Sequence, residues 1–144
     1  MTTTPTATAS TPTLHRILGI GLVLLAIVFL ALTYGGMRPL LAADGVTPPT
    51  IAYAFAGVAV AFVAVALFVC KPRVPNRGPG QSADEYWSTP EVSEKVVLVW
   101  FFLEGAGILA GVGYLLTGEL APVIAMGLAI LVLWMFGPNA FANA

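Results

Sequence analysis

Glu104 is the residue best placed to do chemistry in this 144-residue chain, because it is the one acid inside the chain's long apolar runs. An acid at the centre of a bilayer costs about 2.5 to 3.5 kcal/mol, so such residues usually face a bundle interior or a water-filled cavity. Three interpretations fit Glu104. It relays a proton or cation, it joins helices as a hydrogen-bonded acid, or it contacts a cofactor or another subunit.

The other reactive side chains are too few to build a catalytic site. A single histidine and a single cysteine provide neither a disulfide nor a four-ligand zinc site. No nucleophile with a base, no paired carboxylates and no nucleotide-binding loop occurs in the sequence. We therefore expect no catalytic residue, no metal site and no enzyme activity, and the sequence names no cofactor.

Four single residues carry weaker signals. His15 precedes the first apolar run, and we expect it to be interfacial, with a headgroup or ligand contact as the alternative. Cys70 ends the second run, and we expect an inert interfacial thiol, with S-acylation as the alternative. Trp100 and Trp134 are expected to pack in the core or against lipid, with a pigment, quinone or lipid pocket as the alternative.

The composition excludes a soluble globular protein. Hydrophobic residues make up 58% of the chain and charged residues only 9%, against about 25% charged residues in ordinary soluble domains. The net charge of −1 provides no basic surface for nucleic acid. Four apolar runs approach the ~20 residues that a helix needs to cross a bilayer, and they cover residues 17–34, 51–70, 96–116 and 120–136. The sequence thus predicts an all-α integral membrane protein with four transmembrane helices.

Positive charges predict how these spans are oriented. Short loops rich in Lys and Arg remain on the cytoplasmic side, and five of the six cations fall on one side of the predicted layout, with only Arg38 on the other. We therefore expect two antiparallel hairpins in the inner (plasma) membrane with both termini cytoplasmic. Four of these cations are expected to set this topology and to contact anionic headgroups: Arg16, Lys71, Arg73 and Arg77.

Segments outside the spans are assigned by composition. The uncharged residues 1–13 are predicted to form a disordered tail, and residues 14–144 a single transmembrane domain. Residues 71–89, rich in proline and glycine, are predicted to be an irregular cytoplasmic loop. Thr89 and Pro90 then indicate a helix start before the membrane, with Glu91 and Lys95 paired one turn apart.

Small residues near Glu104 predict close helix packing. Gly107 and Gly111 form a GxxxG pair that helical spacing places on the face of Glu104. We expect that face to meet another helix rather than lipid. The second span offers a matching stripe of small residues, namely Ala54, Gly57, Ala61 and Ala64.

The segment from Trp100 to Gly111 carries a resemblance. Its sequence, WFFLEGAGILAG, resembles the carboxylate helix of the proteolipid (c) subunits of rotary ATPases, in which small residues follow an acid at the membrane centre. It is also similar to small four-helix bacterial membrane proteins of unknown function. The resemblance covers about 20 of the 144 residues and implies a proton-binding role for Glu104.

Two functions are consistent with these features. The first is a non-enzymatic accessory subunit of a larger energy-transducing or transport complex, whose partners are the lipid bilayer and either other membrane subunits or further copies of this chain. The alternative is a membrane protein that handles protons or cations through Glu104.

Overall fold

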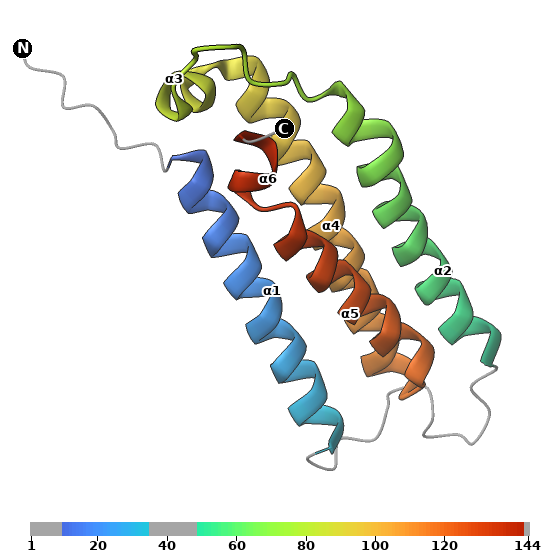
Figure 1. Ribbon diagram of the computed structural model, residues 1–144. Coiled ribbons are helices and arrows are strands. Elements are labelled where there is room, and N and C mark those ends of the chain that lie inside the picture. Colours follow the sequence, from blue (N-terminus) through green and yellow to red (C-terminus); the bar gives the residue numbers. More distant parts are fainter. Residues whose placement is uncertain (1–9, 35–48, 143–144) are drawn as a thin grey trace, which may run out of the picture.

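A computed structural model describes residues 10–34 and 49–142, and all regular secondary structure in this part of the chain is helical (Figure 1). This confirms the all-α prediction. A π-helical turn, Ala66–Cys70, and a 3-10 turn, Lys71–Arg73, continue the α-helix that ends at Val65. The α-helices are α1 (Thr11–Tyr34), α2 (Pro49–Val65), α3 (Ala83–Ser88), α4 (Pro90–Thr117), α5 (Leu120–Met135) and α6 (Pro138–Ala142).

Three helical segments are long and apolar enough to cross a membrane. This is compatible with a multi-pass membrane protein. The fourth predicted span, α5, is apolar but has only 16 residues. The three long segments are Thr11–Thr33, Pro49–Arg73 and Pro90–Thr117.

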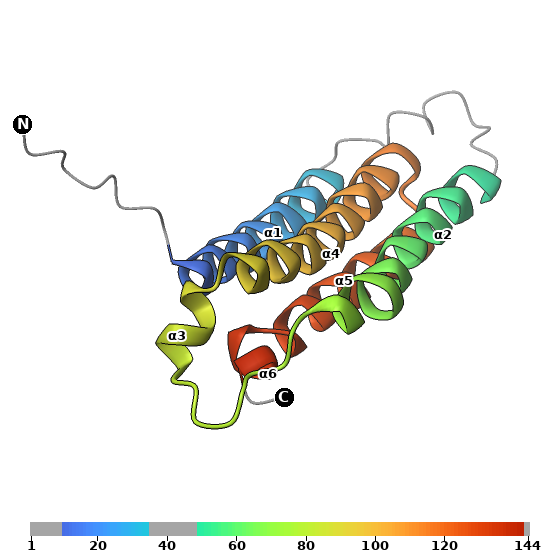
Figure 2. The same ribbon diagram turned by 90° about the horizontal axis from the view of Figure 1, so that it is seen from above.

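The helix α4 lies at the centre of the bundle and packs against α1, α2 and α5 (Figures 1 and 2). Gly118 ends α4 in the left-handed conformation that favours glycine, with φ of 69°, and its N–H donates to the Tyr114 carbonyl. The chain then returns at once as α5, antiparallel to α4. In contrast, α1 and α2 make little contact with each other within the described residues, since α4 and α5 lie between them. The first predicted hairpin is therefore not a packed pair.

The start of α4 agrees with the sequence prediction. Pro90 is its first residue, and Glu91 pairs with Lys95 across one turn. The Thr89 hydroxyl does not cap α4, because it donates to the Glu85 carbonyl at the end of α3. The Thr89 side chain is therefore bonded to the end of α3 and not to the first turn of α4.

Two boundaries of the predicted tail and loop are wrong. Helix α1 begins at Thr11 rather than after residue 13, because the Ser10 carbonyl accepts the N–H groups of Thr13 and Leu14. Within the predicted irregular loop 71–89, residues 83–88 form α3. That helix is started by a capping box in which Ser82 and Glu85 each accept the backbone N–H of the other.

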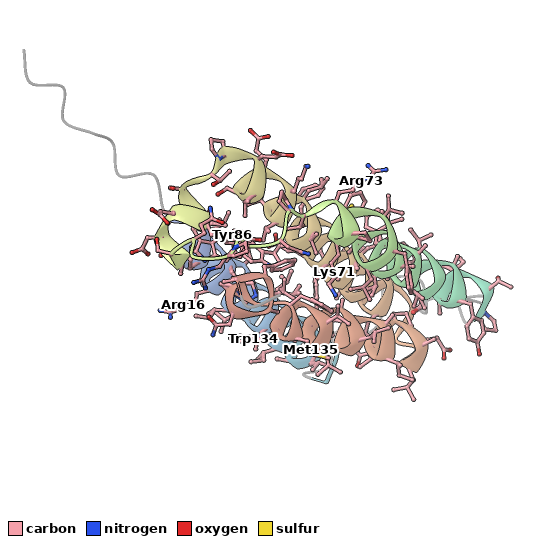
Figure 3. All side chains as sticks on the ribbon, turned by 45° about the horizontal axis from the view of Figure 1, so that its top comes forward. Arg16, Lys71, Arg73, Tyr86, Trp134 and Met135 are labelled. Carbon is pink, nitrogen blue, oxygen red and sulfur yellow. The ribbon has the colours of Figure 1, made fainter. Side chains whose placement is uncertain are left out.

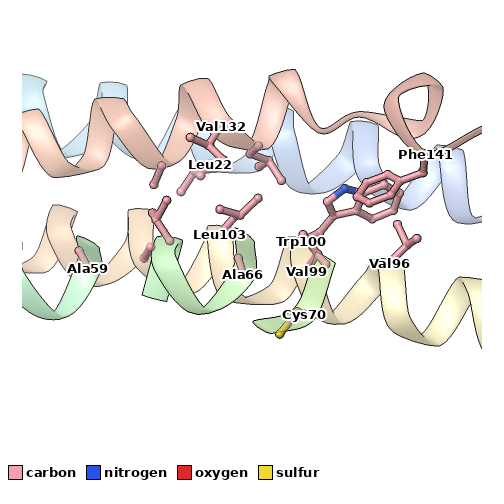
Figure 4. Packing of buried hydrophobic residues seen from close by; sticks show 14 of the residues in the cluster. Leu22, Ala59, Ala66, Cys70, Val96, Val99, Trp100, Leu103, Val132 and Phe141 are labelled. Atoms are coloured by element: carbon pink, nitrogen blue, oxygen red, sulfur yellow. The ribbon is translucent and has the colours of Figure 1, made fainter. Parts of the chain in front are cut away.

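The end of the chain is folded back onto the bundle. Pro138 starts the short helix α6, and its Phe141 is buried with the ring centroid 6.3 Å from that of Trp100 (Figure 4). Trp100 itself is fully buried, and its indole N–H donates to the Phe136 carbonyl over 2.8 Å. The C-terminal segment therefore closes one end of the hydrophobic core.

Candidate functional site

The glycines of α4 are sites of close contact with other helices. A Cβ placed on Gly107 would lie 2.7 Å from a terminal carbon of Leu22 in α1. A Cβ placed on Gly111 would likewise collide with the ring of Phe29, also in α1. The GxxxG face of α4 is therefore buried against α1. The sequence instead suggests the second span as its partner, because that span carries a matching stripe of small residues.

The predicted small-residue stripe of α2 faces away from the core of the bundle. Ala54, Gly57 and Ala61 are exposed and Ala64 is half-buried. The face of α2 that enters the core is another row of small side chains, Ala52, Ala59, Val63, Ala66 and Cys70 (Figure 4). The contact between α2 and α4 is close at Gly113 of α4. A Cβ on Gly113 would lie 2.5 Å from the Cβ of Phe55 in α2.

Glu104 lies at the edge of the bundle rather than in its interior. Its side chain is half-buried, and its helical neighbours Phe101 and Ile108 are 64% and 39% exposed. The face of α4 that the sequence predicts to meet another helix is therefore divided within the described residues. Gly107 and Gly111 point to α1, while Glu104 points to the opening between α2 and α4.

Two adjoining cavities form a groove along this opening, which we call the α2/α4 groove. The larger, of about 350 Å³, contains Glu104, and the smaller, of about 180 Å³, contains Ala54. Leu109 lines both. The other lining residues are apolar: Phe55, Val58, Phe62, Phe101, Gly105, Ile108 and Val112.

Within residues 10–34 and 49–142, no cation or hydrogen-bond donor is brought to the Glu104 carboxyl group. The ion pair found in this part of the chain, between Lys95 and Glu91, lies in the first turns of α4. A carboxyl group in an apolar groove is costly unless it is paired or hydrogen-bonded. Within the described residues, Glu104 therefore lacks the partner that an acid in a membrane usually has.

His15 is buried among the helices of the bundle. It is 4% exposed, and its Nε2 lies 3.0 Å from the Leu133 carbonyl oxygen. Because a carbonyl can only accept, the Nε2–H group is the donor. The imidazole ring lies 4.7 Å from the Trp100 ring and 6.1 Å from the Trp134 ring. His15 thus ties α1 to α5.

The predicted cations gather at the same end of the molecule as His15 (Figure 3). Arg77 donates to the carbonyls of Gln81 and Ala142, at 2.6 and 3.3 Å. The Lys71 ammonium lies 4.3 Å above the Phe136 ring. Arg16 and Arg73 are exposed.

A buried tyrosine holds the segment between α2 and α4 in place. The Tyr86 hydroxyl donates to the Pro75 carbonyl over 2.9 Å, and burial raises the pKa of this hydroxyl above its ordinary value. On the exposed side of α3, the hydrogen bonds from the Ser82 backbone and side chain lower the pKa of Glu85. Neither Tyr86 nor Glu85 lines the α2/α4 groove.

The geometry offers one unsatisfied group in the groove and no set of reactive groups. Three or more His, Cys, Asp or Glu residues do not gather into a metal site anywhere in the described ranges. Comparisons with protein-family models, curated proteins and solved structures find no match for this chain. Its function must therefore be inferred from the groove itself.

Proposed function

We propose that this protein is a non-enzymatic accessory subunit of a larger membrane complex, of the energy-transducing or transport kind, and that the α2/α4 groove receives a transmembrane helix of a partner subunit. The observation that carries the proposal is the position of Glu104, half-buried in an apolar groove at the edge of the bundle. Leaving this acid against lipid would cost about 2.5 to 3.5 kcal/mol. A partner helix with a donor or cation at that depth removes most of this cost.

The surface beside Glu104 is suited to a helix. Ala54 lines the groove, and the exposed small residues Gly57 and Ala61 follow it along α2, so that another backbone can come close. In lipid, helices associate through such close packing and through hydrogen bonds between them, because there is no hydrophobic gain from leaving the acyl chains. A carboxyl next to a smooth stripe supplies both contributions.

The proposed topology has four spans in an inner (plasma) membrane, with both termini on the cytoplasmic side. The 16 residues of α5 extend about 24 Å, somewhat less than the ~30 Å of a typical hydrocarbon core. This length is compatible with a span because a bilayer thins locally around a short helix. The cations Arg16, Lys71, Arg73 and Arg77 lie at one end of the bundle, and the positive-inside rule makes that end cytoplasmic.

Site-specific photo-crosslinking in native membranes tests the proposed interface. A photoreactive residue at Ile108, beside Glu104, should form an adduct with a second polypeptide of defined mass. The matched control is Leu24, which is 57% exposed on α1, where lipid adducts alone are expected. Equal yields of the same protein adduct from both positions would contradict a specific groove interface, and lipid adducts alone from Ile108 would contradict a partner helix.

A proton- or cation-handling protein is the second candidate, favoured by the accessibility of an acid that has no partner in the described chain. Here Glu104 itself binds the ion. This function predicts that a hydrophobic carbodiimide modifies Glu104 in a pH-dependent way, and that Glu104→Gln abolishes ion flux in proteoliposomes while the fold is kept. The accessory role predicts no ion flux in wild type, and Glu104→Gln should still assemble because an amide also forms hydrogen bonds.

A further inference from the structure

A separate cavity lies at the cation-bearing end of the bundle, away from the α2/α4 groove. It has a volume of about 360 Å³ and lies between the start of α1 and the junction of α5 with α6. This is the size range of small-ligand sites. Its walls include His15, Arg16, Trp87, Trp134 and Met135. We propose that this cavity binds the phosphate of an anionic phospholipid, with the acyl chains lying along the exposed surface of α1 and α5.

The charge needed to hold a phosphate comes from Arg16. Arg16 is one of the residues that line the cavity, and no carboxylate of the described chain forms an ion pair with it. Arginine presents a planar set of donors that matches two oxygens of a phosphate. One acid, Asp84, lines an adjoining cavity that shares Pro12 and Trp87 with this one. Asp84 therefore weakens the positive field at the cavity without cancelling it.

The inner wall of the cavity is rigid and polar. His15 is 4% exposed, and its bond to the Leu133 carbonyl fixes the orientation of the ring. Gly137 lies against that ring, since a Cβ at this position would be 3.3 Å from His15 Cε1 and 3.5 Å from the Trp134 carbonyl oxygen. A larger residue would press on the histidine. The site is thus formed before any ligand arrives, which lowers the entropy cost of binding.

The outer rim of the cavity favours a lipid over a soluble phosphate. Trp134 and Met135 are 50% and 62% exposed, and Ile17, next to Arg16 on α1, is 58% exposed (Figure 3). Tryptophan and arginine at the end of apolar helices mark the level of the headgroups in a bilayer. A phospholipid that places its phosphate at Arg16 has its acyl chains beside these side chains. A free phosphate would leave this apolar rim unused.

The test compares lipid retention in native mass spectrometry after extraction from nanodiscs of phosphatidylcholine with a minor share of phosphatidylglycerol. Wild type should retain one phosphatidylglycerol. Arg16→Gln should weaken this binding about fivefold, the effect of one cation at a membrane surface. Lys95→Gln is the matched control, since it removes the same charge from a residue that does not line the cavity, and it should bind as wild type does. Equal losses in both variants would overturn the proposal, because they would show only a diffuse attraction.

Two further variants and one competition keep the result clear. Arg16→Lys retains the charge without the paired donors, so its binding should lie between wild type and Arg16→Gln. Asp84→Asn should bind at least as well as wild type. Inorganic phosphate in excess should not displace the lipid, and displacement would assign the site to a soluble anion instead. Unchanged phosphatidylglycerol binding in a folded Arg16→Gln protein would refute the proposal outright.

Discussion

The close approach of α2 and α4 can be tested by adding one methyl group at Gly113. A Cβ there would lie 2.5 Å from the Cβ of Phe55 and 2.8 Å from its Cγ. Carbon atoms in contact are about 3.5 to 4.0 Å apart. Because the Phe55 Cβ moves only with its backbone, Gly113→Ala requires α2 to shift away from α4 by roughly 1 Å.

The size of the effect follows from comparison with a second glycine. Overpacking of this kind costs about 1 to 3 kcal/mol, while replacing glycine by alanine within a helix returns about 0.8 to 1.0 kcal/mol. Gly57 in α2 is exposed, and no atom lies within 4 Å of its added Cβ. Gly57→Ala has the same helix propensity gain without the clash. We therefore expect Gly113→Ala to be less stable than Gly57→Ala by about 1 to 3 kcal/mol.

The assay is equilibrium unfolding in mixed micelles by titration with sodium dodecyl sulfate, followed by tryptophan fluorescence. Trp100 is fully buried in the core, so its emission reports the loss of packing. Gly113→Ala should unfold at a lower detergent fraction than Gly57→Ala. If the two variants share one midpoint, α2 and α4 are not in contact at Gly113 and the packing described above is wrong.

Trp100→Phe removes the indole donor to the Phe136 carbonyl and should cost about 1 to 3 kcal/mol in the same detergent titration followed by circular dichroism; no change would mean that this bond is not formed. Hydrogen bonds from Ser82 lower the pKa of Glu85, so the stability they give α3 is present above the ordinary pKa and is lost as the pH falls through the lowered one. The protection factors of amide hydrogens in α3, which correct for the intrinsic pH dependence of exchange, should fall on acidification in wild type but not in Ser82→Ala, and equal pH dependence would contradict the capping box. The buried Cys70 thiol should react with maleimide more slowly in the folded protein than in the unfolded one, and equal rates would place it at the surface.

Local signals near Pro90 were sufficient to predict the start of α4. A proline at the first helical position and the spacing of Glu91 and Lys95 depend only on neighbouring residues, and the structure has both features. The capping box of α3 has an equally local signal in Ser82 and Glu85. The prolines and glycines of residues 72–80 hid it, because they favour an irregular loop for the whole segment.

The buried face of α2 could not be read from the sequence. Small residues occur on both sides of this helix, with Ala54 and Gly57 exposed and Ala59 and Ala66 buried. Both faces of a membrane helix are apolar, so polarity does not tell the core side from the lipid side. The burial of His15 was equally hidden, since it depends on Trp100, which is remote in the sequence.

The position of Glu104 within α4 was predictable, but its direction was not. Helical spacing places Gly107 and Gly111 near the face of Glu104. The structure divides that face, with the glycines against α1 and the acid in the α2/α4 groove. Which part of the face meets α1 depends on the shapes of Leu22 and Phe29, and these become relevant only when the helices pack.

Native mass spectrometry of the protein extracted in mild detergent tests whether the α2/α4 groove holds a helix of a partner subunit. Wild type should carry foreign subunits in a fixed ratio. Ala54→Leu fills the groove and should lose them, whereas Ala31→Leu, at an exposed alanine of α1, should keep them. A wild-type protein that is a monomer or a pure homo-oligomer, or a partner that Ala54→Leu retains as fully as Ala31→Leu does, would contradict the account.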